Sequence, residues 1–105
     1  MTESEYRHLA DTTLGGLENA LDAADLDYER AGGGVLEIEF DDGSMIVVNK
    51  QAAAQEIWVA AKSGGFHYRW DGAAWRDTRG GEELLAALSR LASAQAGRDL
   101  DLARS

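Results

Sequence analysis

Acidic side chains crowd the first part of the chain, and carboxylate oxygens are the ligands that hard cations prefer. Residues 1–42 hold twelve acidic and two basic residues, whereas the remainder is nearly balanced, within a net charge of −9. The tightest group ends the predicted first helix and enters the next strand: Glu18, Asp22, Asp25, Asp27 and Glu29. The glycine and glutamate offsets of an EF-hand are missing. We therefore expect an open row of carboxylates that binds cations such as iron(III), calcium, magnesium or manganese weakly.

The same charge pattern has a simpler interpretation, because a solvated acidic face needs no ligand. The excess of acids argues against binding to nucleic acids, which normally requires a basic face. It suits cations or basic protein surfaces as partners.

A second group of candidate residues lies in the middle of the chain: Asn49, Gln51 and Trp58, with His67 and Arg69 on neighbouring predicted strands. In the sequence Ile57-Trp58-Val59, alternation favours Ile57 and Val59 inside and Trp58 outside. An exposed tryptophan on a sheet often marks a binding surface. The alternative is that Trp58 belongs to the core.

Several classes of chemistry lack the residues they need. The sequence contains no cysteine, so disulfides, thiolate metal sites and cysteine nucleophiles are excluded. It contains no nucleophile elbow, P-loop or GxGxxG motif. No apolar run is long enough to span a membrane, and the acidic N-terminus does not resemble a secretory signal. We expect a soluble, cytoplasmic protein.

The elements that must position these residues follow from periodicity. Thr2 and Glu5 form a capping box, and an apolar stripe through Tyr6, Leu14 and Leu21 predicts a first helix. Alternating or apolar runs separated by turn signals predict strands at 25–29, 35–40, 45–50, 56–61, 66–70 and 74–77. The period of 3.6 returns after Gly81 and predicts a second helix ending near Gly97.

This order of elements predicts an α+β fold with one domain over residues 1–105. We expect a two-layer α–β sandwich, in which two terminal helices pack on one face of a largely antiparallel sheet of about six strands. The opposite face of the sheet would be open to solvent.

Three segments carry a resemblance to a known family. Residues 58–68 (WVAAKSGGFHY), 49–51 (NKQ) and 5–11 (EYRHLAD) resemble the frataxin family, and within it the bacterial branch. The resemblance covers nearly the whole chain in the right order. It implies the same α–β sandwich that the periodicity predicts.

The resemblance also implies a function, namely an iron-binding accessory protein of iron–sulfur cluster assembly. Iron (Fe2+ or Fe3+) would bind at Glu18, Asp22, Asp25, Asp27 and Glu29, with Asp11 and Glu3 as outlying candidates. The same acidic residues would meet a basic patch on a cysteine desulfurase, and Asn49, Gln51 and Trp58 would face the desulfurase–scaffold complex. Asn19, Ala23 and Ala24 stand where relatives often have acids or an aromatic residue. This difference implies a lower iron capacity.

Two other functions remain open at this stage. A ferroxidase would oxidise iron(II), but the sequence lacks the buried Glu-x-x-His pairs of di-iron carboxylate oxidases. A metal-independent interaction module would use the acidic residues for electrostatics alone. We expect a protein that is not an enzyme and is a monomer without iron.

Overall fold

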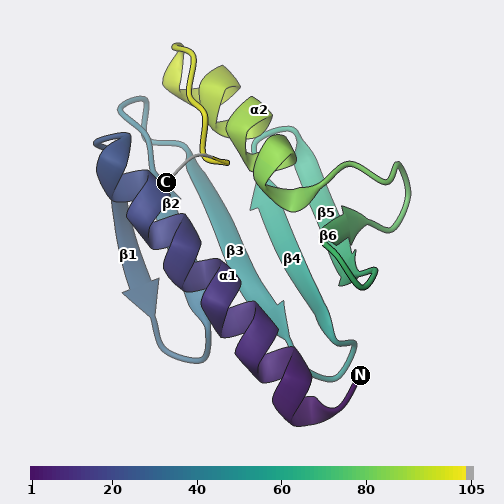
Figure 1. Cartoon of the computed structure of the whole chain (residues 1–105). Coiled ribbons are helices and arrows are strands. Elements are labelled where there is room, and N and C mark those ends of the chain that lie inside the picture. Colours follow the sequence, from purple (N-terminus) through teal and green to yellow (C-terminus); the bar gives the residue numbers. More distant parts are fainter. Residues whose placement is uncertain (104–105) are drawn as a thin grey trace.

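The computed structural model describes residues 1–103 and consists of one six-stranded sheet and two helices (Figure 1). The helices and strands are α1 (Glu3–Ala23), β1 (Asp27–Ala31), β2 (Val35–Glu39), β3 (Met45–Gln51), β4 (Glu56–Ala61), β5 (Gly64–Trp70), β6 (Trp75–Asp77) and α2 (Leu84–Ala96). Strand order in the sheet follows chain order, and every neighbouring pair is antiparallel.

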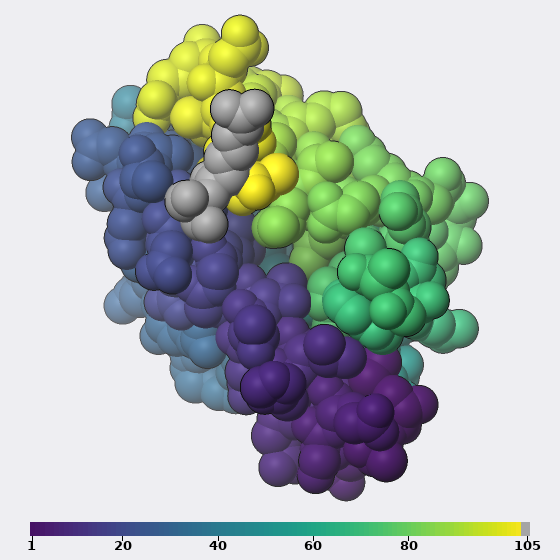
Figure 2. Space-filling model, in the orientation of Figure 1, coloured from purple at the N-terminus to yellow at the C-terminus, as the bar shows by residue number. Residues whose placement is uncertain are grey.

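Both helices lie on one face of this sheet, as predicted, and together they cover much of it (Figures 1 and 2). The core contains the predicted stripe of α1 and the inward-facing residues of the strands. Its fully buried members include Leu14, Leu21, Ile38, Ile57 and Leu88. No helix among residues 1–103 covers the opposite face of the sheet, so its side chains are available to partners. Within residues 1–103, neither helix is long and apolar enough to cross a bilayer.

The helix ends follow the sequence signals. Thr2 and Glu5 form the predicted capping box at α1. Glu83 lies just before α2 rather than inside it, and its carboxylate accepts hydrogen bonds from the N–H groups of Leu85 and Ala86. Gly97 ends α2 at a φ of 70°, a left-handed conformation that glycine adopts without strain.

Two strands differ from the prediction by two residues at a boundary, and the other strands by one residue at most. The first strand was expected at 25–29 but runs from Asp27 to Ala31. Asp25 has a φ of 59°, and the N–H of Leu26 still bonds to the Leu21 carbonyl, so these residues close the helix instead of joining the sheet. The apolar–polar alternation starts early because Leu26 packs on the core from a turn. Strand β5 also starts earlier, since Gly64 and Gly65 pair with β4.

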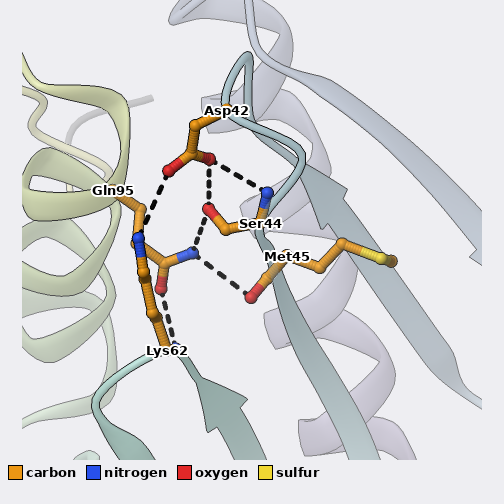
Figure 3. Close-up of polar contacts among 5 residues, drawn as sticks. All are labelled: Asp42, Ser44, Met45, Lys62 and Gln95. Atoms are coloured by element: carbon orange, nitrogen blue, oxygen red, sulfur yellow. Dashed lines mark hydrogen bonds and ion pairs between the residues drawn. The ribbon is translucent and has the colours of Figure 1, made fainter.

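Polar contacts join the loops at one end of the sheet to α2 (Figure 3). The side chain of Gln95 donates to the Ser44 hydroxyl and the Met45 carbonyl and accepts from the backbone N–H of Lys62. Asp42 accepts from Ser44 and pairs with Lys62 at 3.4 Å. These contacts connect two hairpin turns to one helix and hold the sheet against it.

Candidate metal and partner surface

The open face of the sheet can be assigned from strand register. Side chains alternate between faces, so the residues adjacent to buried ones in each strand point away from the helices. Asp27 pairs with Glu39 and Glu29 with Glu37 at the β1 edge. Farther across the sheet, Trp58 pairs with both Asn49 and His67. Glu56 pairs with both Gln51 and Arg69, and Arg69 in turn with Arg76.

We define the acidic patch as the four carboxylates Asp27, Glu29, Glu37 and Glu39. They form two cross-strand pairs of like charge, an arrangement that destabilises a sheet by about 0.2–1 kcal/mol per pair. No ion pair joins any of the four to a base among residues 1–103. The patch is therefore a concentration of uncompensated negative charge beside the edge strand.

The helix-side carboxylates are held by other side chains of this chain and so differ from the open row that the sequence predicts. The Arg30 guanidinium lies 2.6 Å from the Glu18 carboxylate, and the Tyr28 hydroxyl donates to Asp22 at 2.9 Å. Tyr28 and Arg30 pair with the buried residues Ile38 and Leu36 and thus face α1. Glu18 and Asp22 consequently lie on the opposite side of β1 from Asp27 and Glu29. The candidates do not form a single row.

The two outlying candidates are paired as well. Lys50 reaches the Asp11 carboxylate at 2.6 Å, and Arg7 lies 3.2 Å from Glu3 one turn away on α1. Asp25 is exposed in the turn after α1, with no ion pair among residues 1–103. Of the predicted candidates, Asp25, Asp27 and Glu29 have neither an ion pair within residues 1–103 nor a contact like that of Asp22 with Tyr28, and Glu37 and Glu39 likewise form no ion pair there.

The predicted partner residues form a second region, which we call the aromatic platform: Asn49, Gln51, Trp58, His67 and Arg69. The Trp58 and His67 rings stack with centroids 4.3 Å apart and planes 8° apart. Ile57 and Val59 are buried, which confirms that Trp58 faces away from the core. The sequence-based interpretation of Trp58 as a core residue is therefore excluded.

Glu56 lies beneath this platform and was absent from the sequence-based candidates. It is 5% exposed, the only charged residue among the buried ones of residues 1–103. Its carboxylate accepts from the Trp58 indole N–H at 2.8 Å and from Arg69 at 2.6 Å, and His67 Nδ1 lies 3.7 Å away. The hydrogen bond from Trp58 and the contact with Arg69 lower the pKa of Glu56 despite its burial.

Comparisons with known proteins agree with this architecture. A model of the frataxin-like domain matches residues 1–98. The chain belongs to the frataxin family. It is 58% identical to the iron-sulfur cluster assembly protein CyaY of Dechloromonas aromatica, over 97% of this chain and 99% of that protein. It is 56% identical to the protein of the same name from Cupriavidus metallidurans, over 97% and 96%.

Solved frataxin structures share the fold. Frataxin from Psychromonas ingrahamii superposes with a TM-score of 0.88 at 31% identity, over 97% of this chain and 98% of that one. Trimeric frataxin from Saccharomyces cerevisiae, described as complexed with ferrous iron, superposes with a TM-score of 0.67 at 25% identity, over 93% and 88%. The fold predicted from periodicity is thereby confirmed.

The donor set of this frataxin-family chain suits a hard cation in type but not in arrangement. Carboxylate oxygens are the right ligands. Across residues 1–103, however, no three acidic or histidine side chains are grouped to hold one ion. His8 is exposed on α1. The arrangement can attract cations to several exposed positions, each held by few ligands.

Glu37, Glu39 and Glu56 were not among the predicted site residues, although alternation along their strands indicates which face they occupy. Glu37 and Glu39 alternate with Leu36 and Ile38, so the predicted strand already placed them on the open face. Glu56 stands two residues before Trp58 and shares its face by the same rule. Its burial could not be read from the sequence, because it depends on β5 placing Arg69 opposite.

Proposed function

We propose that this chain is a non-enzymatic, cytoplasmic accessory protein of iron–sulfur cluster assembly. It binds iron(II) or iron(III) weakly at exposed carboxylates and docks on the cysteine desulfurase–scaffold complex, as iron donor or regulator. Family membership and the names of the relatives support the assembly role. The observation that carries the iron and docking roles is the acidic patch, whose carboxylates face one another without a basic partner among residues 1–103.

Iron binding would reduce the electrostatic repulsion between the paired carboxylates of the acidic patch. A cation near Asp27 and Glu29 reduces the repulsion with Glu39 and Glu37, so binding there needs no internal contact to break. At Glu18, by contrast, iron must displace Arg30, and at Asp22 the Tyr28 hydroxyl. We therefore expect Asp25, Asp27 and Glu29 to respond to iron first, and Glu18, Asp22, Asp11 and Glu3 later.

Docking follows from the charge gradient along the open face. Acids without ion pairs occupy the open face of β1 and β2, whereas Arg69 and Arg76, at the far end on β5 and β6, are paired with Glu56 and Asp71. A basic surface on the desulfurase would meet the acidic end, and the aromatic platform would meet the scaffold. An uncompensated negative charge at only one end fixes the orientation of a partner more than it raises its affinity.

Iron binding is tested by titrating iron(II) anaerobically, and iron(III) separately, while recording backbone amide NMR spectra. We expect broadening first at residues 25–29, 37 and 39. Asp27→Asn should weaken this broadening. Asp99→Asn is the control and should not weaken it, because it makes the same charge change at an exposed residue after α2. Uniform broadening over the whole chain would contradict the site assignment. Oxygen consumption per iron above that of buffer would instead indicate a ferroxidase.

Docking is tested by cluster assembly with purified desulfurase and scaffold, with and without this chain, in iron-containing and metal-free buffer. We expect Asp25→Lys and Asp27→Lys to weaken binding to the desulfurase and raised salt to weaken it further. Unchanged binding in metal-free buffer, with no effect of iron on the assembly rate, would favour the metal-independent interaction module.

A further inference from the structure

We propose that Glu56 is a positioning residue for partner binding: it holds Trp58, His67 and Arg69 in the arrangement that the partner contacts. This inference rests on the proposed docking function and deepens it. Glu56 itself is shielded from a partner, because its side chain is only 7% exposed. Its effect on binding must therefore pass through the three side chains around it.

The burial of Glu56 is unusual for its place in the fold. It lies on the face of the sheet opposite both helices, so neither helix of residues 1–103 covers it. Two platform side chains, Trp58 and Arg69, bond to its two different oxygens. A buried carboxylate is tolerated only when such partners satisfy it. The same contacts restrain the partners in return.

The two bonds decide which groups the platform can offer. The indole N–H of Trp58 is committed to Glu56, so Trp58 presents its ring rather than a donor. The ring is further oriented by its stack on His67. Arg69 uses one nitrogen on Glu56, yet its side chain stays 65% exposed, which leaves guanidinium N–H groups facing outward. The platform thus fits a partner surface that combines an apolar or aromatic group with a carbonyl or carboxylate acceptor.

Preorganisation is the physical basis of the proposed effect. Binding must order each side chain that was mobile beforehand, and that cost lowers affinity. Glu56 orders Trp58 and Arg69 in the free protein, before any partner arrives. Without the carboxylate, both must be ordered on binding, and we expect about a tenfold loss of affinity.

The test compares two substitutions with a matched control. Glu56→Gln keeps an oxygen for the Trp58 indole but removes the charge that holds Arg69, whereas Glu56→Ala removes both contacts. Glu82→Gln is the control, because it also neutralises a glutamate paired with an arginine, Arg90 at 2.8 Å, but lies beside α2. Affinity for the desulfurase–scaffold complex should fall about tenfold in Glu56→Ala, two- to threefold in Glu56→Gln and not in Glu82→Gln.

A spectroscopic signal separates positioning from general destabilisation. The indole N–H resonance of Trp58 should move strongly in Glu56→Ala, less in Glu56→Gln and not in Glu82→Gln, while backbone signals of α1 and α2 stay in place. If Glu56→Ala does not fold, Glu56→Gln still decides through its affinity and its indole signal. Wild-type affinity in Glu56→Gln with an unmoved indole signal would overturn the proposal.

A double-mutant cycle shows whether Glu56 acts through Trp58. In a Trp58→Ala background, Glu56→Ala should cost threefold or less, because one of the groups it positions is already gone. A full tenfold loss in that background would overturn the proposal. If Trp58→Ala itself leaves affinity unchanged, the proposed docking face is wrong, and the indole signal then reports separately whether Glu56 orders the platform.

Discussion

Carboxylates on the open face of the sheet lie in two opposite environments. On β1 and β2, Asp27, Glu29 and their two cross-strand partners face solvent and one another, and none of the four forms an ion pair with a base among residues 1–103. On β4, Glu56 is buried and bonded to Trp58 and Arg69. The first region keeps its charge available to ligands, and the second uses its charge to organise neighbours. A glutamate's role here depends on its partners across the sheet, not on its residue type.

The helix side of β1 shows an intermediate case. Glu18 and Asp22 are partly satisfied by Arg30 and Tyr28, and the hydrogen bond to Asp22 raises the pKa of the Tyr28 hydroxyl. That phenol therefore stays protonated and keeps donating to a higher pH than an ordinary tyrosine does. These carboxylates can serve a ligand only after exchanging an internal contact, unlike those of the acidic patch.

The largest contrast between the two regions should appear in stability. Glu56→Ala leaves the Trp58 indole and Arg69 without their acceptor, and we expect it to lower the free energy of unfolding by about 1–3 kcal/mol. Glu29→Ala removes an exposed side chain that faces a like charge, so its effect should stay within about 0.5 kcal/mol. Urea unfolding followed by circular dichroism measures both. If Glu56→Ala and Glu29→Ala lowered the free energy of unfolding equally, Glu56 would contribute no more to stability than an exposed glutamate.

A second difference is expected in how the stability of the protein depends on pH in the acid range. Folding lowers the pKa of Glu56 below its ordinary value, mainly through the hydrogen bond from Trp58 and then through Arg69. Ionised Glu56 thus stabilises the fold above the unfolded-state pKa, and this contribution is lost as pH falls through the folded-state pKa. Between about pH 6 and pH 3, wild type should lose more stability than Glu56→Gln. Parallel curves for the two proteins would contradict the assignment.

The smallest effect concerns repulsion within the acidic patch. Replacing Asp27 by Asn and Glu29 by Gln together removes one charge from each like-charged pair, and should raise stability by a few tenths to about 1 kcal/mol at low salt. The gain should shrink at about 1 M salt, where screening already weakens the repulsion in wild type. Thermal unfolding at two salt concentrations measures it. A gain that does not depend on salt would mean that repulsion is not its cause.

Much of the fold could be predicted because local patterns and tertiary packing agree. Leu36, Ile38 and Phe40 alternate with polar residues and are all buried, as the alternation predicts. The stripe through Leu14 and Leu21 likewise forms the buried face of α1. The pattern failed at Asp25 and Leu26, where a residue packs on the core from a turn and resembles a strand residue in sequence.

The order of elements, the buried stripe and the outward orientation of Trp58 were encoded in residue spacing, because periodicity is a local property of the chain. Which carboxylates keep their charge available was not encoded in this way. Arg30 neutralises Glu18 only because β1 runs back beside α1, and Arg69 reaches Glu56 only because β5 pairs with β4 in one register. Such pairings join residues twelve or thirteen positions apart, so they arise from packing between elements and have no signature within either element.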